Sequence, residues 1–473
     1  MSKEVLLRVK DLRVRLKATG ALLFEGVDLE LHAEQRLTLI GESGSGKSIF
    51  AQAIIGILPD ALQTSGCVEI AGHRTDGQRS RTQPLWGNTV VMLPQEPWST
   101  LNPLMRILPQ VAESAHYVTR ASWPQARAAA LAGLKQLGVD HAAHQYLHQI
   151  SGGMAQRVGV VAAGMGGARL LLADEPTKGL DDDSREQVAQ LLAAAQGRGQ
   201  ALLTITHDLD LARQLGGTLM VVQRGNVVEM GDAEQVLSNP QHEYTRALVA
   251  AMPAKWSPLV QPLKPKHGTA VIPVIQGRGL SKRYATRRLF DDVNISIAPG
   301  EVVSVSGHSG CGKTTLGNIL LGVKSADRGE VLRSSVPRWK FGKLYQDPLA
   351  AFPPQRRLRD ALNDLVRLHG LDGSRIGPLM QELSLRPELL DRLPSEVSGG
   401  ELQRISLMRL LLLEPAFIFA DEPTSRLDLI TQQDTMRLIC RAAQQHECAV
   451  LLVSHDASLA RASSHRQIMM AQH

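Results

Sequence analysis

The sequence predicts an α/β protein built from two consecutive copies of one domain. A glycine-rich segment with the pattern G-x-x-x-x-G-K-[S/T] occurs twice, ending at Lys47-Ser48 and at Lys313-Thr314. Each copy also contains short apolar runs bounded by polar turns, a pattern that is typical of buried parallel strands. The 473 residues are enough for each copy to bury a hydrophobic core of its own.

Three further segments recur in the same order in both copies. They are S-G-G-x-x-Q-R from Ser151 and Ser398, A-D-E-P-T from Ala173 and Ala420, and [T/S]-H-D from Thr206 and Ser454. These pairs are separated by 247 or 248 residues, whereas the two glycine-rich lysines are 266 residues apart. The second copy is therefore shorter near its start, by about one hairpin.

The apolar runs predict the strands of two parallel sheets, each followed by a helical pattern. We expect strands at 37–40, 170–173, 202–205, 302–305, 417–420 and 450–453, and helical segments at 104–150 and 356–390. Five prolines between the copies are typical of an extended, semi-rigid spacer. We therefore expect a first domain at 1–253, a linker at 254–272 and a second domain at 273–473.

Composition narrows the class of protein without choosing a function. The net charge of +6 suits a polyphosphate ligand, a nucleic acid or an anionic membrane surface, but a solvated surface with a slight arginine excess explains it equally well. The four cysteines show no C-x-x-C spacing, which favours a reducing compartment and argues against disulfides or a zinc site. The sequence has no run of 18 apolar residues, so we expect no membrane-spanning helix.

The two glycine-rich segments have the chemistry of phosphate-binding loops. Their glycines let backbone N–H groups converge on phosphate oxygens, and the dipole of the following helix adds attraction. We expect Lys47 and Lys313 to bridge the β- and γ-phosphates, and Ser48 and Thr314 to hold Mg²⁺. A purely structural glycine turn is the alternative, but two matches between a strand and a helix argue against it. The other predicted loop residues are Gly41, Ser43, Gly44, Gly46, Gly307, Ser309, Gly310, Gly312 and Thr315.

Two carboxylates stand at the end of an apolar strand in each copy. Asp174 and Asp421 are placed to act as further Mg²⁺ ligands, and Glu175 and Glu422 to orient or deprotonate an attacking water. Taken alone, such pairs could be surface carboxylates, but their pairing with phosphate loops favours catalysis. A histidine that follows the next strand in each copy could contact the γ-phosphate. These histidines are His207 and His455.

With these motifs in place, nearly the whole chain resembles a tandem ABC-type ATPase. The S-G-G segments match the ABC signature, whose residues are Ser151, Gly152, Gly153, Ser398, Gly399 and Gly400. The resemblance implies ATP and Mg²⁺ as ligands, and glutamine-loop residues Gln95 and Gln346 that reach the metal and nucleotide. It also implies that each domain has a RecA-like parallel sheet core, an antiparallel β subdomain and a helical subdomain.

In that family two domains sandwich two ATP molecules, each held by the phosphate loop of one domain and the signature of the other. Both sites here keep every catalytic residue type, so we expect both to hydrolyse ATP. Tyr284 stands where the family places an aromatic ring against adenine, but the matching position of the first copy is Leu16. The resemblance therefore implies weaker adenine binding by the first copy.

Two stretches resemble the peptide/nickel importer subgroup of ABC ATPases, with both subunits fused. They are the stretch Gln95-Glu-Pro97-Trp-Ser99-Thr-Leu-Asn102-Pro103 and the tail Pro240–Leu248. The resemblance implies a peripheral protein on the cytoplasmic face of the bacterial inner membrane, with two permease subunits and, through them, a solute-binding protein as partners. Neither nucleic acid nor zinc is expected. Peptides, nickel, metal chelates and opine-type molecules stay open as cargo. A soluble accessory ATPase, of the phosphonate-degradation or ribosome-acting type, is the alternative.

Overall fold

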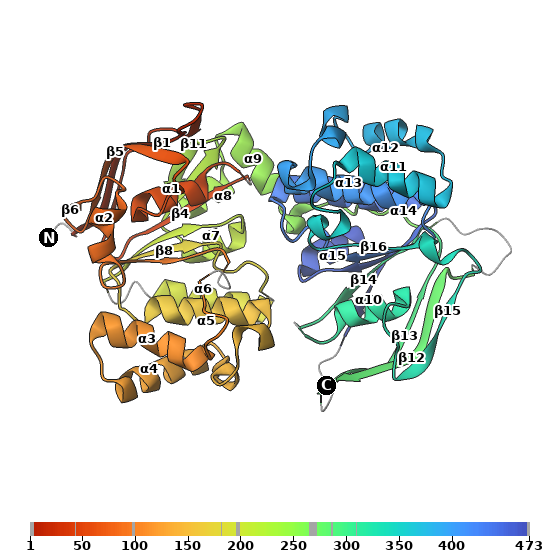
Figure 1. Ribbon diagram of the computed structural model, residues 1–473, viewed down its shortest axis with the longest axis horizontal. Coiled ribbons are helices and arrows are strands. Elements are labelled where there is room, and N and C mark those ends of the chain that lie inside the picture. The colour runs from red at the N-terminus through yellow and green to blue at the C-terminus, as the bar shows by residue number, and fades with distance from the viewer. Residues whose placement is uncertain are drawn as a thin grey trace. The chain divides into compact units, whose positions relative to one another are not determined.

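The computed structural model describes residues 4–42, 44–96, 100–180, 182–194, 199–263, 272–284, 287–308 and 310–470. The chain divides into two compact units, Met1–Ala250 and Ala251–His473. Each unit combines a mainly parallel core sheet, an antiparallel sheet and a group of helices, as the sequence predicted (Figure 1).

The first unit is built on a six-stranded core sheet in the order β11-β10-β4-β9-β8-β7. Its strands are β4 (Arg36–Gly41), β7 (Val90–Leu93), β8 (Leu170–Asp174), β9 (Ala201–Ile205), β10 (Thr218–Gln223) and β11 (Asn226–Asp232). All neighbouring strands are parallel except β10 and β11. The three strands predicted for this copy are confirmed as β4, β8 and β9, whose continuous apolar runs are buried on both faces of the sheet.

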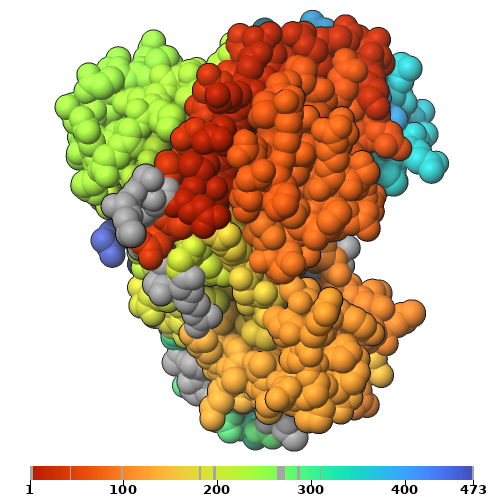
Figure 2. Space-filling model, turned by 90° about the vertical axis from the view of Figure 1, so that its left-hand side faces the viewer, coloured from red at the N-terminus to blue at the C-terminus, as the bar shows by residue number. Residues whose placement is uncertain are grey.

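An antiparallel sheet and two groups of helices complete the first unit. The antiparallel strands are β1 (Val5–Leu16), β2 (Leu22–Phe24), β3 (Leu29–His32), β5 (Leu62–Ile70) and β6 (His73–Arg74). The helical subdomain contains α3 (Ile107–Thr119), α4 (Trp123–Gln136) and α5 (Gly152–Gly164). The other helices are α1 (Lys47–Ile55), α2 (Arg79–Thr82), α6 (Asp182–Ala194), α7 (Leu209–Leu215), α8 (Ala233–Ser238) and α9 (Glu243–Ala250). Figure 2 shows the β1–β5 layer and the α3–α4 lobe as separate parts of this unit's surface.

The second unit repeats this plan around a five-stranded parallel sheet in the order β16-β17-β18-β14-β19. Its strands are β14 (Val302–Ser306), β16 (Phe341–Leu344), β17 (Phe417–Asp421), β18 (Ala449–Val453) and β19 (Arg466–Met469). The antiparallel sheet contains β12 (Ile275–Tyr284), β13 (Arg287–Ile297) and β15 (Arg328–Arg333). The helices are α10 (Lys313–Leu321), α11 (Leu358–His369), α12 (Ile376–Glu382), α13 (Gly399–Leu412), α14 (Leu429–Gln445) and α15 (Ala457–Ser463).

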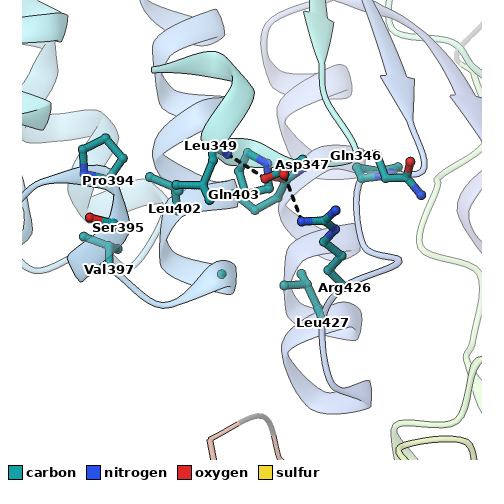
Figure 3. A pocket seen from close by; sticks show the side chains of 13 residues that line it. Gln346, Asp347, Leu349, Pro394, Ser395, Val397, Leu402, Gln403, Arg426 and Leu427 are labelled. Carbon is teal, nitrogen blue, oxygen red and sulfur yellow. Dashed lines mark hydrogen bonds and ion pairs between the residues drawn. The ribbon is translucent and has the colours of Figure 1, made fainter. Parts of the chain in front are cut away.

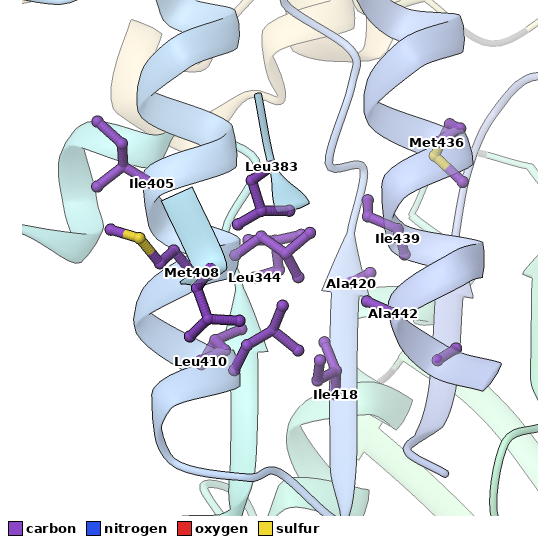
Figure 4. Packing of buried hydrophobic residues seen from close by; sticks show 14 of the residues in the cluster. Leu344, Leu383, Ile405, Met408, Leu410, Ile418, Ala420, Met436, Ile439 and Ala442 are labelled. Carbon is purple, nitrogen blue, oxygen red and sulfur yellow. The ribbon is translucent and has the colours of Figure 1, made fainter. Parts of the chain in front are cut away.

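The core of the second unit lies on both faces of this sheet. Because side chains alternate along a strand, Ile418 and Ala420 of β17 pack with α13 and α14, whereas Phe417 and Phe419 pack with α10. Figure 4 shows the first of these clusters, in which Leu410 of α13 and Ile439 of α14 lie toward the strands. The sheet is therefore held rigidly between helices, and the loops at its edge carry the site.

The predicted difference in length between the copies is visible in the elements. Between α1 and β7 the first unit holds β5, β6 and α2, whereas β15 is the one strand between α10 and β16.

At the division between the units, the indole of Trp256 lies in the core of the second unit and Leu259 donates its N–H to the carbonyl of Ala462 at 2.7 Å. No helix within the described ranges is long and apolar enough to cross a bilayer.

Candidate nucleotide site

The glycine-rich segments form the loops predicted for phosphate binding. In each unit the loop joins a core strand to a helix, β4 to α1 and β14 to α10, and the helix begins at the predicted lysine. Gly46 and Gly312 are the N-caps of these helices, with φ values of 93° and 101°. A residue with a side chain would adopt this backbone conformation only at a cost in free energy. Ser43 and Ser309 lie outside the described residues. The other predicted loop glycines, all with positive φ, are Gly41, Gly44, Gly307 and Gly310.

Both lysine ammonium groups fold over their own loops. Lys47 Nζ donates to the carbonyl oxygens of Gly41 at 2.9 Å and Glu42 at 2.7 Å, and Lys313 Nζ donates to that of Gly307 at 2.7 Å. Each buried cation is thus held next to the N-terminus of a helix, where the backbone N–H groups also attract anions. This arrangement favours a polyphosphate ligand.

The two strand-end aspartates lie beside the loops, as predicted, but their surroundings differ. Asp174 at the end of β8 is hydrogen-bonded by Ser48, and burial raises its pKa to about 6. Within the described part of the chain, its buried Oδ1 has no hydrogen-bond partner. A buried carboxylate oxygen without a partner, next to a serine hydroxyl, suits a divalent cation. The residues of the first unit therefore fit the Mg²⁺ that the family resemblance implies.

In the second unit both oxygens of Asp421 are engaged by the protein. Thr314 Oγ1 donates to Oδ1 at 2.9 Å, and Lys343 Nζ lies 2.8 Å from Oδ2. Lys343 was not among the predicted site residues, because this lysine on β16 lies outside every motif. The matching residue of the first unit, Met92, is uncharged, and comparing the two copies position by position could have revealed the difference.

The glutamates predicted to be catalytic sit on strained backbone. Glu175 and Glu422 have φ values of 50° and 48°, in the left-handed region that costs a non-glycine residue about 1–2 kcal/mol. Their N–H groups are held by the carbonyl oxygens of Ile205 and Val453 on the neighbouring strands. Such strain is found at functional sites, where the surrounding structure over-determines the conformation.

Each glutamate is paired with the predicted histidine of its own unit. The His207 Nδ1 atom lies 2.8 Å from Glu175 Oε2, and the His455 Nε2 atom lies 2.6 Å from Glu422 Oε1. The charge of the Glu175 carboxylate raises the pKa of His207, although burial acts to lower it. Burial acts to raise the pKa of Glu175, but the charge of His207 and its hydrogen bond hold that pKa below its ordinary value. The shifts of the two pKa values favour the charged form of each partner in the first pair.

The glutamine-loop residue of the second unit contacts the predicted catalytic glutamate. Gln346 Nε2 donates to Glu422 Oε2 at 2.7 Å, so the predicted glutamine and glutamate of the second unit meet directly. Gln95 follows β7 in the first unit, and the stretch after it, Pro97 to Ser99, lies outside the described residues. The glutamine of the second unit thus connects the core sheet to the carboxylate that would handle water.

The signature serines stand at the N-termini of helices α5 and α13. Ser151 caps α5 by accepting from Met154 N–H, and Ser398 caps α13 by accepting from Glu401 N–H, with Gly152, Gly153, Gly399 and Gly400 in the first turns. In the described part of each unit, no hydrogen bond joins the serine to the phosphate loop of its own unit. The signature residues are therefore presented at a helix N-terminus, which is suited to an anion.

Leu16 and Tyr284 occupy the same place in the two units. They are the last residues of β1 and β12, the long strands of the antiparallel sheets. The Tyr284 hydroxyl accepts from Lys324 Nζ at 2.8 Å, and the residue as a whole is 44% exposed. The ammonium groups of Lys282 and Lys324 lie 5.6 and 5.3 Å from the centroid of this ring, whereas Leu16 has no aromatic face to offer a planar ligand.

A hollow of about 180 Å³ lies beside the glutamine loop of the second unit. Its walls come from the loop after Gln346, the segment before α13 and the loop after Asp421 (Figure 3). Arg426 Nη1 forms an ion pair with Asp347 Oδ2 at 2.9 Å across it, and Leu349 is 45% exposed at its edge. The hollow therefore offers both an apolar contact and fixed charges within reach of the catalytic loops.

Comparison with known proteins agrees with this geometry. The family model described as ABC transporter matches residues 24–178 and 290–425, and that of the oligopeptide/dipeptide transporter C-terminal region matches 228–290. The chain is 33% identical, over 98% of its length and 91% of the relative's, to the peptidoglycan transport ATP-binding protein YejF of Agrobacterium fabrum. It is 31% identical, over 94% of its length and 81% of the relative's, to the glutathione import ATP-binding protein GsiA of Salmonella choleraesuis.

Among solved structures, the chain resembles one titled RNase-L Inhibitor. The TM-score is 0.65 over 97% of this chain and 87% of that chain, with 19% sequence identity. At that identity the likeness concerns the fold of two tandem domains and not the activity.

Proposed function

Because this chain belongs to the ABC transporter ATP-binding proteins, with two ABC ATPase domains of the oligopeptide/dipeptide class in one polypeptide, we propose that it powers the import of peptides or peptide-like molecules. The observation that carries this proposal is the 228–290 match, which begins on β11 and includes α9 of the first unit. The names of the relatives, which concern peptidoglycan transport and glutathione import, support a peptide-derived cargo. Nickel, metal chelates and opines are less well supported.

In this proposal the chain's own residues bind ATP and position its cleavage. Lys47 and Lys313 neutralise the terminal phosphates, and Glu175 and Glu422 orient the attacking water while their histidines hold them in place. Ser48 and Asp174 would hold Mg²⁺ in the first unit, and Thr314, Asp421, Gln95 and Gln346 are the other candidate ligands. When bound, Mg²⁺ neutralises charge on the phosphate oxygens.

We further propose that the chain works at the cytoplasmic face of the membrane with two permease subunits, and through them with a solute-binding protein. The hollow beside Gln346 supports this role, because a permease segment bound there would contact the loops that hold Glu422. A soluble accessory ATPase is the alternative function, and it predicts no membrane partner.

Site-specific cross-linking tests the proposed partner. A photoreactive residue at Leu349, in the hollow, should cross-link to an integral membrane protein in cells of the source organism. The matched control is Leu332 on β15, which is similarly exposed (41% against 45%) but belongs to the antiparallel sheet. Cross-links from neither position, or only to soluble proteins, would favour the accessory ATPase. Loss of labelled-peptide uptake when the gene is deleted would test the cargo.

A further inference from the structure

The second unit carries a lysine at its strand-end aspartate. Lys343, the third residue of β16, places Nζ 2.8 Å from Asp421 Oδ2, and both side chains are more than four-fifths buried. The other carboxylate oxygen accepts from Thr314 Oγ1 at 2.9 Å. A divalent cation at this carboxylate would therefore have to displace or share contacts that the protein already makes.

The ammonium group is held by aromatic rings as well as by the carboxylate. Lys343 Nζ lies 4.8 Å from the ring centroid of Phe419 and 5.4 Å from that of Tyr345. Lys343 and Phe419 are paired across the parallel ladder of β16 and β17, so the strand register puts them together. A cation over an aromatic face is attracted by the ring, and more strongly when it is desolvated, as this buried ammonium is. The position of this charge is therefore built into the sheet.

The first unit has none of these groups at the matching positions. In the same register β7 and β8 pair Met92 with Leu172, and Pro94 stands where the second unit has Tyr345. In the described part of that unit Asp174 forms no ion pair, and its Oδ1 has no partner. The two units thus differ at the aspartate although every motif residue type is kept.

The two units also differ in the helix that packs against Phe419. A Cβ at Gly317 in α10 would lie 2.3 Å from the ring of Phe419, so glycine is required where the ring packs. The first unit has Ala51 at that position of α1, in the same core cluster as the smaller Leu172. Glycine inside a helix is less favourable than alanine, and here the bulk of Phe419 explains why glycine is present. The aromatic surroundings of Lys343 are therefore matched by a change in the neighbouring helix.

From this set we propose that Lys343 makes nucleotide binding by the second unit nearly independent of divalent cations, whereas the first unit requires them. The ammonium supplies a resident positive charge next to the phosphate loop, and its pairing with Asp421 makes that carboxylate a poorer ligand for an added cation. In the first unit the buried oxygen of Asp174 gains a partner when a cation binds. This difference concerns ATP binding alone and does not depend on which molecule is transported.

The test compares nucleotide affinity with and without metal at each site of the full chain. Lys47→Ala isolates the second site, and Lys313→Ala isolates the first. Binding of trinitrophenyl-ATP is measured in excess Mg²⁺ and in EDTA. We expect the dissociation constant of the first site to rise at least about tenfold in EDTA, and that of the second to change less than about threefold.

Exchanging the residues between the units assigns the effect to Lys343. The quantity compared is the dissociation constant of trinitrophenyl-ATP in EDTA divided by that in Mg²⁺. In the Lys47→Ala background, Lys343→Met should raise this ratio about tenfold, and Lys343→Arg should keep it low. Paramagnetic resonance of Mn²⁺ with ADP reads the metal directly and should show tighter Mn²⁺ binding in Lys343→Met. In the Lys313→Ala background, Met92→Lys should lower the ratio of the first site.

Two results would overturn the proposal. One is equal ratios at the two unmodified sites. The other concerns Lys343→Met protein whose melting temperature equals that of the parent. If its dissociation constants in EDTA and in Mg²⁺ keep the parent ratio, and its Mn²⁺ affinity is unchanged, the proposal fails. If Lys343→Met does not fold, the Met92→Lys exchange decides, because an unchanged ratio there contradicts the role assigned to the ammonium.

Discussion

The His455 imidazole places Nε2 2.6 Å from Oε1 of Glu422, on a residue whose backbone is held in the left-handed region. The histidine comes from the loop after β18 and the glutamate from the loop after β17, so two adjacent parallel strands aim the pair at the same edge of the sheet. Gln346 Nε2 holds the second oxygen at 2.7 Å. A carboxylate held by two side chains in this way is prepared to orient a water molecule.

Replacing both glutamates by glutamine should remove hydrolysis and keep binding. A carboxamide has nearly the same shape but is not a base, so we expect turnover by the Glu175→Gln/Glu422→Gln double variant to fall at least about 100-fold. Phosphate release and trinitrophenyl-ATP binding measure the two properties separately. The Lys47→Ala/Lys313→Ala protein serves as the control that loses binding as well.

Turnover retained in the double glutamine variant would show that another group activates the water. The single variants add information about the two sites. If the second unit uses divalent cations poorly, Glu175→Gln should remove a larger share of the Mg²⁺-dependent activity than Glu422→Gln.

The ends of β1 and β12 predict unequal adenine binding. Tyr284 offers a ring and Leu16 does not, and stacking on a base is worth about 1–3 kcal/mol. A difference of 1 kcal/mol corresponds to about fivefold in the dissociation constant. With the other site blocked at its lysine, Tyr284→Leu should weaken ATP binding by the second unit, and Leu16→Tyr should strengthen it at the first. Tyr284→Phe is the matched control and should keep the affinity. No change in Tyr284→Leu would show that a different residue contacts adenine.

The tail helix α9 is tied to the core sheet by one carboxylate. Glu229 on β11 accepts from the N–H groups of Gln241 at 2.8 Å and His242 at 3.0 Å. Burial acts to raise the pKa of Glu229, but these hydrogen bonds outweigh it and the pKa lies below its ordinary value. Because the folded-state pKa is lowered, the stabilisation is present above the ordinary glutamate pKa and is lost as the pH falls through the folded value.

Glu229→Gln should therefore loosen α9 at neutral pH. The amide keeps one acceptor oxygen, so we expect a loss of about 1 kcal/mol and about fivefold faster hydrogen exchange of the α9 amides. Below about pH 4 the difference from the parent protein should shrink, because the parent loses its charge as well. Glu234→Gln, at an exposed carboxylate of α8, is the control and should leave α9 unchanged. A difference that grows in acid would contradict the assignment.

The parts of this structure that local patterns encode were predictable. The strands that end at Gly41 and Asp174 are apolar runs of a few residues, and the loop before Lys47 needs only glycines at fixed spacing. The ion pair of Lys343 with Asp421 was not predictable in this way, because it depends on the register of two strands more than 70 residues apart in sequence. Likewise, the proline-rich composition near Trp256 says nothing of the core into which this indole packs.

The stability of the second unit should depend on glycine at position 317, because a side chain there would clash with the Phe419 ring. Two substitutions test this dependence. In Gly317→Ala the new methyl group would lie 2.3–2.5 Å from three ring atoms, and overpacking of this kind costs about 1–3 kcal/mol although alanine favours a helix. We expect the second unit to unfold at lower urea concentration, measured by hydrogen exchange of β17 amides, with β8 amides of the first unit as the internal reference. Gly317→Ala/Phe419→Leu should recover most of the loss, since it recreates the Ala51 and Leu172 combination of the first unit. Gly377→Ala in α12, where a Cβ meets open space, is the control and should not destabilise. If Gly317→Ala were as stable as the parent, the Phe419 ring could not occupy the place described, and the aromatic surroundings of Lys343 would lose their support.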